Sequence, residues 1–232
     1  MSLQDLFASR FEEYDEARIV YDQVPIRLFK SDALEWFTHV SPVVVVILFL
    51  PVVIGSLVYG VLHWTTGVSW LLIPLLFAAG LSIWTLTEYL VHRFFFHLEP
   101  RSVWGKRLIF LFHGIHHVQP HVKTRLVMPP AVSIPGAALF YVLFALLFRW
   151  LGAAEMMWPA FAGFTLGYIS YDLLHYSEHH MPMKGAVLKF LKRHHMEHHY
   201  KTPQARFGVS TSMWDEVFHT EPHTETYNEA VK

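Results

Sequence analysis

The longest pattern in the sequence is a stretch without any Asp, Glu, Lys or Arg, from Trp36 to Thr87. These 52 residues are too many for one membrane helix, because about 20 apolar residues at about 1.5 Å each cross a bilayer. The segment GVLHWTTGVS divides the stretch, which predicts spans near residues 40–61 and 68–90. Two prolines fall inside these spans, where neighbouring helices can satisfy the freed carbonyl groups, so we expect kinks rather than helix ends.

A second apolar pair follows later in the chain. Leu126–Phe148 is uncharged, the segment RWLGAAE predicts a turn, and Met156–Tyr171 continues the apolar pattern as far as Asp172. The sequence therefore predicts an all-α integral membrane protein with four transmembrane helices in two hairpins.

The basic residues indicate how these helices are oriented. Of the 18 Lys and Arg residues, all except Arg149 fall in the N-terminal segment, in residues 91–125 or after Asp172. Because basic residues are enriched on the cytoplasmic side of membrane proteins, we expect both termini and these segments to be cytosolic. The membrane itself is expected to be a bacterial inner membrane or the endoplasmic reticulum.

The predicted spans define a single domain, 1–232. It consists of a cytosolic lead-in at 1–35, a membrane core at 36–180 with a cytosolic insert near 91–125, and a cytosolic cap at 181–232. The first residues are polar and acidic and lack the apolar region of a signal peptide. We expect them to form a short amphipathic or poorly ordered segment outside the bilayer.

Composition agrees with a membrane protein and narrows its chemistry. Hydrophobic residues make up 53% of the chain and charged residues 16%, against about 25% charged in a typical soluble domain. A net charge of −1 gives no reason to expect nucleic-acid binding. The absence of cysteine excludes disulfides, iron–sulfur ligation and thiolate zinc sites, so the 17 histidines are the main supply of metal ligands.

Ten histidines fall into four short motifs, all at cytoplasmic span ends or in cytoplasmic segments. The motifs are HRFFFH, HGIHH, HYSEH and HMEHH. Helical hairpins would bring these distant segments together, which predicts one metal centre. Its expected ligands are His92, His97, His113, His116, His117, His175, His179, His195, His198 and His199.

The spacing within the motifs predicts how the rings are arranged. Positions i, i+3 and i+4 lie on one helical face, so we expect HGIHH and HMEHH each to direct three rings towards a common point. His92 and His97 are five residues apart, about 140° around an ideal helix, and diverge unless the helix unwinds or they serve two metals. Ten imidazoles exceed the needs of one six-coordinate ion, which favours two adjacent metals.

The identity of the metals follows from the ligand type and the reaction it allows. Imidazole binds zinc, copper, iron and nickel alike. The sequence lacks the H-E-x-x-H motif of zinc hydrolases, and it has only one E-x-x-H, Glu216 to His219, where soluble di-iron bundles need two. An all-histidine pair beside a membrane favours a di-iron centre that activates O₂ against an unactivated C–H bond. Zinc could occupy the same ligands in purified protein.

The remaining candidate residues are assigned from their neighbours. Glu88 precedes His92 by four residues and Asp172 precedes His175 by three, so each carboxylate could accept the second N–H of its histidine. Weaker candidates for the same role are Glu178, Glu197 and Asp215. The other histidines are expected outside the ligand set: His180 and His194 break the spacing, and His39, His63, His121, His219 and His223 are expected at the interface or in the core.

Several longer blocks carry a family resemblance. The segments HGIHH…RLVMPP, GYISYDLLHYSEHH, HHMEHHYK…FGVS…WDEVF and the earlier RLFKSDALEWFT cover roughly Ile26 to Thr220. They resemble the fatty acid hydroxylase superfamily and, within it, the fatty acid 2-hydroxylases. The resemblance implies a membrane-bound di-iron oxidoreductase with four transmembrane helices and a cytosolic cap, whose ligands map onto the ten histidines above.

The resemblance also implies a reaction and a substrate class. The reaction is an O₂-dependent hydroxylation at C2 of a long acyl chain, free or part of a sphingolipid. Tyr171 and Asp172 match the YD pair of the family and are expected to shape or orient the site. Aromatic residues could line the acyl channel, although core packing is the simpler role for them: Phe94, Phe95, Phe96, Tyr168 and Tyr171.

The sequence departs from the family pattern in two places. It has no H-P-G-G haem motif of a cytochrome b5 domain, so we expect no haem and a separate electron donor of cytochrome b5 or ferredoxin type with its reductase. That donor, or anionic lipid headgroups, could bind Lys184, Lys189, Lys192 and Arg193. His121 and Lys123 stand where an acidic residue is expected, which affects the loop and not the metal ligands.

Two other functions remain open at this point. An enzyme of the same superfamily acting on a sterol, carotenoid or alkane, or desaturating an acyl chain, would share every ligand. A membrane protein that binds or transports metal without redox chemistry is the alternative from another class. Lipid product formation that depends on O₂ would distinguish the enzymes from the transporter.

Overall fold

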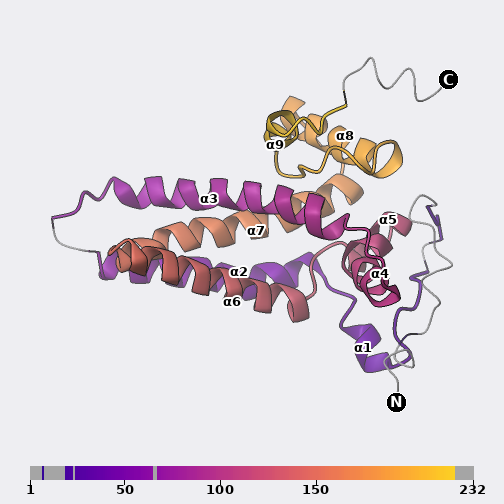
Figure 1. Cartoon of the computed structure of the whole chain (residues 1–232), viewed down its shortest axis with the longest axis horizontal. Coiled ribbons are helices and arrows are strands. Elements are labelled where there is room, and N and C mark those ends of the chain that lie inside the picture. Colours follow the sequence, from indigo (N-terminus) through magenta and orange to yellow (C-terminus); the bar gives the residue numbers. More distant parts are fainter. Residues whose placement is uncertain (1–6, 8–18, 23, 65–66, 223–232) are drawn as a thin grey trace.

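The protein is a bundle of long helices with shorter helices at one end of the bundle. The structure, a computed structural model, describes residue 7 and residues 19–22, 24–64 and 67–222. Within these residues all regular elements are helices, which confirms the predicted all-α class, and an isolated bridge joins Phe7 to Phe29. Figure 1 shows the long helices lying along one another and the short ones gathered at one end.

The four long helices occupy the four predicted spans. Helix α2 continues through Pro51, as expected, whereas Pro74 lies in the first turn of α3. The last predicted span was expected to end near Asp172, but its helix continues for two more turns. Pro182 is the first residue after Asp172 that is unfavourable inside a helix, so the helix ends just before it. The bounds are α2 Pro42–Leu62, α3 Leu72–Val91, α6 Pro130–Trp150 and α7 Met157–His180.

Three helical segments are long and apolar enough to cross a membrane: Pro42–Leu62, Leu72–Phe96 and Lys123–Trp150. They carry large apolar side chains on the outside of the protein, including Ile47 at 66% and Leu146 at 61% exposed. Helix α7 differs because the other helices cover it, so its side chains include buried polar groups instead of a lipid-facing apolar surface. The count of four spans therefore stays a prediction at this helix.

Helix α7 lies at the centre of the bundle, in contact with α2, α3 and α6. Glycines allow the backbones of α3 and α7 to approach closely. A Cβ atom built on Gly80 would lie 1.9 Å from the Ala160 carbonyl oxygen, and one on Gly163 would lie 1.9 Å from the Phe77 carbonyl oxygen. Small residues at such crossings are typical of membrane helix pairs. This crossing fixes the histidines at the end of α7 relative to those that follow α3.

The short helices form a cap at one end of the bundle (Figure 1). The segment after α3 contributes a π-helical turn, two short α-helices and a second π-helical turn, and the C-terminal part contributes two further helices. Their bounds are η3 His92–Phe96, α4 Val103–Ile109, η4 Phe110–Gly114, α5 Ile115–Val118, α8 Ala186–Tyr200 and α9 Met213–Val217. The 3₁₀ turns η5 Lys123–Arg125 and η6 Ala154–Met156 precede α6 and α7.

The described part of the lead-in packs on this cap. The Gln119 side-chain oxygen accepts a hydrogen bond from the Ile26 N–H at 2.8 Å. Glu35, in helix α1 (Asp32–Trp36), accepts the Leu28 and Phe29 N–H groups at 2.9 and 2.8 Å and pairs with Arg125. The lead-in from Val24 onward is thus an ordered part of the cap, and the expectation for residues 1–18 lies outside the described residues apart from Phe7.

Candidate metal centre

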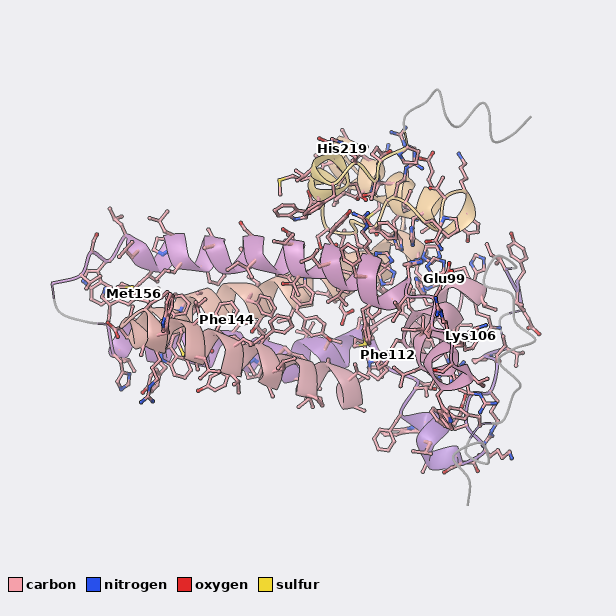
Figure 2. All side chains as sticks on the ribbon, viewed as in Figure 1. Glu99, Lys106, Phe112, Phe144, Met156 and His219 are labelled. Atoms are coloured by element: carbon pink, nitrogen blue, oxygen red, sulfur yellow. The ribbon has the colours of Figure 1, made fainter. Side chains whose placement is uncertain are left out.

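The ten histidines predicted as ligands come together where the ends of α3 and α7 meet α5 and α8. Figure 2 shows the side-chain nitrogens gathered there, close to Glu99. Two groups of five can be separated, each offering ring nitrogens that all lie within 4.8 Å of one another. The first histidine group is His92, His97, His113, His117 and His198, and the second histidine group is His116, His175, His179, His195 and His199.

In the first histidine group the Nε2 atoms face one another. His113 Nε2 lies 3.0 Å from His92 Nε2 and 2.9 Å from His117 Nε2. His97 Nε2 lies 3.3 Å from His92 Nε2, and His198 Nε2 lies 3.3 Å from His117 Nε2. Five rings from three separate parts of the chain therefore present the same nitrogen to one small volume.

The second histidine group has the same arrangement. His175 Nε2 lies 2.9 Å from His116 Nε2, and His179 Nε2 lies 2.9 Å from His195 Nε2. His199 Nε2 lies 3.1 Å from His195 Nε2. The two groups are in direct contact, because the His117 and His199 rings stack with their centroids 4.2 Å apart.

Each three-histidine motif is divided between the groups, which corrects the expectation of a common point. In HGIHH, His113 and His117 belong to the first group and His116 to the second. In HMEHH, His195 and His199 belong to the second group and His198 to the first. The reason is angular: at about 100° per residue, i and i+4 lie only about 40° apart, whereas i+3 lies about 100° from i+4.

The π-helical turn η3 explains how His92 and His97 share one group. The His97 N–H donates to the His92 carbonyl at 3.2 Å, an i to i+5 bond that replaces the α-helical pattern. The wider turn brings residues five apart onto one face, so the two rings converge where an ideal helix would separate them. Of the two alternatives that the spacing left open, the structure has the altered helix.

The spacing of the ring nitrogens fits one metal ion in each group. Two imidazoles bound at about 2.1 Å have their nitrogens about 3.0 Å apart at a right angle and about 4.2 Å apart on opposite sides. The shortest distances within the groups, 2.9 to 3.3 Å, agree with ligands at about a right angle. Lone pairs turned towards one another repel unless a cation or a proton lies between them, so the arrangement favours a cation in each group.

Burial keeps the rings neutral, as metal ligation requires. Burial, followed by the His92 and His117 rings, lowers the pKa of His97 to about 2. Burial also lowers the pKa of His117 to about 3, with His92 and His175 adding to the effect. In the second group, burial and then the His175 ring hold the pKa values of His116 and His195 well below the ordinary value of 6.5.

Two outer nitrogens of the first group are held by backbone carbonyl groups. His92 Nδ1 lies 2.5 Å from the Phe207 carbonyl oxygen, and His198 Nδ1 lies 2.6 Å from the Ala205 carbonyl oxygen. A hydrogen bond at Nδ1 fixes the tautomer that directs the Nε2 lone pair inward. No sequence pattern marks these two partners, because every residue has a carbonyl group.

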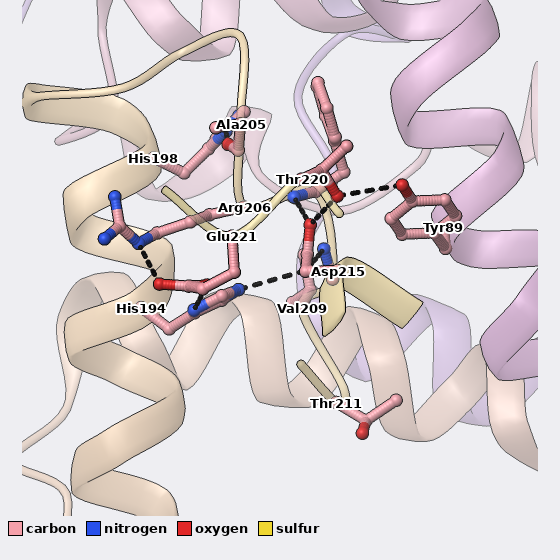
Figure 3. A network of polar contacts seen from close by, with 12 residues as sticks. Tyr89, His194, His198, Ala205, Arg206, Val209, Thr211, Asp215, Thr220 and Glu221 are labelled. Carbon is pink, nitrogen blue, oxygen red and sulfur yellow. Dashed lines mark hydrogen bonds and ion pairs between the residues drawn. The ribbon is translucent and has the colours of Figure 1, made fainter. Parts of the chain in front are cut away.

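Asp215 holds the segment that carries those carbonyl groups. Its carboxylate accepts the Phe207 and Gly208 N–H groups, each at 2.8 Å, and the Thr220 hydroxyl at 2.7 Å. It also lies 3.1 Å from His194 Nε2. Figure 3 shows Asp215 between His194 and Thr220. Burial opposes the charged form, but the hydrogen bonds from His194 and Thr220 outweigh it and lower the pKa of Asp215.

The carboxylates predicted to contact histidine ligands do not do so among the described residues. Glu88 accepts the Val209 and Ser210 N–H groups at 2.7 and 2.8 Å and also the Ser210 hydroxyl, so it anchors the loop instead of His92. Asp172 is buried and makes no hydrogen bond to His175. Spacing placed each carboxylate on the correct helix but could not locate the loop that competes for it.

The three weaker carboxylate candidates differ from one another. Asp215 contacts His194 and positions the loop, as described above. Glu178 is fully buried, and neither of its oxygens has a hydrogen-bond partner within the described part of the chain. Glu197 pairs with Lys201 at 3.3 Å and Arg206 at 3.4 Å, away from the rings.

Tyr171 and several predicted channel residues lie beside the histidine groups. The Tyr171 ring stacks on His175 with centroids 5.7 Å apart, and the Phe96 ring stacks on His113 at 4.9 Å. Both residues line two cavities, of which the smaller also borders His113, His116 and His175 and is lined by Asp172. Among the other predicted aromatics, Phe95 and Tyr168 line the larger cavity, whereas Phe94 is 59% exposed on the surface.

The histidines expected outside the ligand set lie outside both groups. His194 lies between Asp215 and Glu221, and His39 contacts Thr124 and Arg125. His63 stacks on Tyr59 and His121 on Tyr21. His180 and His219 belong to neither group, and His223 lies outside the described residues.

Comparison with known proteins gives the same family from sequence and from structure. A family model described as fatty acid hydroxylase matches residues 77–220. The chain is 34% identical to dihydroceramide fatty acyl 2-hydroxylase FAH1 of Arabidopsis thaliana over 93% of its own length and 87% of that protein. It is 39% identical to fatty acid 2-hydroxylase of Rattus norvegicus over 90% of its own length, and the match spans 60% of that relative.

A solved structure has the same fold. The structure of full-length scs7p, in which only the hydroxylase domain is visible, superposes with a TM-score of 0.77 at 35% sequence identity. The match covers 86% of the present chain and 74% of the other.

Proposed function

Because the chain belongs to the fatty acid hydroxylase family, we propose that it is a membrane-bound oxidoreductase that hydroxylates C2 of a long acyl chain. The observation that carries the proposal is the convergence of ten imidazole rings in two groups of five beside apolar cavities. The names of the relatives support an acyl substrate over a sterol, carotenoid or alkane, and hydroxylation over desaturation. The acyl chain can be a free fatty acid or the N-acyl chain of a sphingolipid.

Two iron ions are the cofactors we propose, one in each histidine group. All ten rings are the ligands: their neutral state and inward Nε2 atoms suit first-row metals, although zinc can occupy the same rings in purified protein. Iron supplies the activation of O₂ that no amino-acid side chain can provide. No haem group is expected among the residues of this centre.

The residues around the rings prepare the acyl chain for reaction. Phe96 and Tyr171 cover one ring of each group and line both cavities, so they exclude water from the reacting carbon. Asp172 is buried beside them and is expected to orient Tyr171 or the polar end of the substrate. We propose Tyr171 and Asp172 as the residues that shape the reaction site.

The overall reaction defines the remaining partner. One atom of O₂ replaces the C2–H bond by C–OH, the other becomes water, and two electrons and two protons are consumed. We propose a separate electron donor of cytochrome b5 or ferredoxin type, served by its reductase. The exposed basic side chains of Lys184, Lys189 and Arg193 give an acidic donor a surface to bind, and anionic lipid headgroups could use the same surface.

The proposed topology places the centre at the cytosolic boundary of the membrane. We propose that α7 crosses the bilayer beside the three apolar helices, which makes two hairpins, α2–α3 and α6–α7. Both termini and the cap would then be cytosolic, in agreement with the distribution of basic residues. C2 is next to the polar end of an acyl lipid, so a centre at that boundary suits the reaction.

The proposal can be tested with isotopic oxygen. Purified, iron-loaded protein with a reducing system should convert an acyl lipid to its 2-hydroxy product, with ¹⁸O from ¹⁸O₂ located at C2 by fragment mass spectrometry. His63→Ala, which changes an exposed histidine outside both groups, should leave the product yield unchanged. Metal movement across vesicles without any hydroxylated lipid would instead support the transporter, and label at another carbon would contradict C2.

A further inference from the structure

Two apolar cavities lie side by side, and the smaller one adjoins the histidine groups. The smaller, about 280 Å³, is lined by His113, His116 and His175, so it reaches both histidine groups. The larger, about 430 Å³, lies deeper in the bundle. Phe96, Phe112, Met128, Val132 and Tyr171 line both. An acyl chain that passes between these shared side chains would reach the larger cavity from the rings.

The larger cavity has the length of an acyl tail. It lies between α3, α6 and α7, and on α7 its lining extends from Tyr171 back to Phe161. Ten residues of helix span about 15 Å. A saturated chain with C–C bonds of about 1.5 Å advances roughly 1.25 Å per carbon, so about a dozen carbons fit beyond the reacting end. Phe140, Phe161 and Phe164 lie around its far part.

Gly136 lies on the wall of this cavity, on the face of α6 that also carries Val132 and Phe140. A Cβ atom built on Gly136 meets no atom within 4 Å. Gly80 and Gly163 differ, because there the partner backbone leaves no room for a side chain. Glycine in a helix interior makes the helix less stable than alanine does. At Gly136 the missing side chain does not allow a close helix contact. It leaves open space in the cavity instead.

We propose that Gly136 determines the acyl chain length that the enzyme accepts, because its missing side chain keeps the deep part of the cavity open. The inference rests on the proposed acyl hydroxylation. Gly136 is four residues beyond Val132, the α6 residue at the junction of the two cavities, which corresponds to about 6 Å or roughly five carbons. A larger side chain at Gly136 closes the cavity at that depth. Chains that end before this point still fit, and longer ones do not.

The test compares Gly136→Leu with Gly55→Leu. Gly55 is a matched control: it lies inside membrane helix α2, a Cβ atom on it also meets nothing within 4 Å, and it lines neither cavity. Saturated N-acyl amides of graded chain length would be offered to each protein. Hydroxylated products would be measured by mass spectrometry, and binding by the thermal shift of the purified protein, which needs no turnover.

Gly136→Leu should lose at least about 10-fold in binding and hydroxylation of the longest chains, while medium chains change little. Gly55→Leu should keep the parent profile. If Gly136→Leu fails to fold, Gly136→Ala is the second variant, since it favours the helix and should weaken only the longest chains. An unchanged chain-length profile in the folded Gly136 variants would overturn the inference. A length shift in binding, with no hydroxylated product from the parent, would retain the cavity assignment and reject the proposed reaction.

Discussion

The two histidine groups contain the same five-ring arrangement but are supported in different ways. In the first group, His92 and His198 bind the carbonyl groups of Phe207 and Ala205 through their outer nitrogens. In the second group, the Nδ1 atoms of His116, His195 and His199 are buried and have no hydrogen-bond partner in the described part of the chain. The first group thus depends on a loop for two of its rings, whereas these three rings of the second group depend on packing.

This difference follows from which elements supply the rings. Four of the five rings in the second group lie on α7 and α8, two helices that pack together. The first group draws rings from η3, η4, α5 and α8, and the loop at residues 205–210 contacts two of those elements. Glu88 and Asp215 hold that loop from two sides. Changes in this loop should therefore weaken metal binding in the first group and leave metal binding in the second group unchanged.

The largest effect should come from removing one ring from each group. His113→Ala and His116→Ala change histidines of the same motif but of different groups. Each variant should retain about one metal equivalent instead of two. Each should lose more than about 100-fold in activity, which is the upper end of the loss seen when a residue that hydrogen-bonds a metal ligand is removed. Metal content by mass spectrometry and anomalous scattering would show which ion is lost. Loss of the same ion from both variants would contradict the division into two groups.

Acid tests a property that the two groups share. The folded, metal-free protein keeps buried rings neutral, since burial lowers the pKa of His117 to about 3 and that of His97 to about 2. Above pH 6.5 these rings are neutral in the folded and unfolded states, and stability is complete. As the pH falls from 6.5 towards 3, only the unfolded chain takes up protons, so the free energy of unfolding should fall, by up to about 1.4 kcal/mol per ring and pH unit.

Thermal unfolding of metal-stripped protein in detergent, followed over this pH range, measures the effect. The variant with His113→Gln and His117→Gln, which lacks two of the titrating rings, should show a shallower dependence than the parent. A stability that stays constant from pH 7 to pH 4 would show that the rings are not held neutral.

The sequence predicted all ten members of the groups because their spacings are local. A repeat at i, i+3 and i+4 can be read from neighbouring residues, and the apolar spans indicated that the four motifs lie at one end of a bundle. The division into groups could not be read in this way. It depends on how α5 and α8 lie against α7, and on a π-helical turn after His92 that no residue in HRFFFH specifies.

The supports of the groups were harder to predict for the same reason. Glu88 and Asp172 have the right spacing for partners of His92 and His175, yet Glu88 binds backbone N–H groups of a loop more than a hundred residues away. The carbonyl groups of Ala205 and Phe207 have no side-chain signal at all. A spacing rule can select residues on one helix, but it cannot decide between two partners when one of them comes from a distant loop.

Replacing Asp215 should have a smaller effect than removing a ring or lowering the pH, but it should distinguish the two groups most clearly. In Asp215→Ala the Phe207 and Gly208 N–H groups lose their acceptor, so the loop carrying the Ala205 and Phe207 carbonyl groups should shift. Outer partners of metal ligands typically contribute 10–100-fold to metal affinity, and a loss in that range, about 1.4–2.7 kcal/mol, is expected for the first group only. Titration with a chelator should then release one ion early and the other at the parent concentration.

Glu216→Ala is the matched control for Asp215→Ala, because Glu216 is the neighbouring acidic residue of α9 and is exposed. It should release both ions as the parent does. Asp215→Asn keeps one oxygen that can accept a loop N–H group and should recover part of the lost affinity. Simultaneous release of both ions from Asp215→Ala would mean that the loop supports the two groups equally. The contrast between a loop-supported and a helix-supported group would then be wrong, because the stacked His117 and His199 rings would couple the two ions more strongly than the loop separates them.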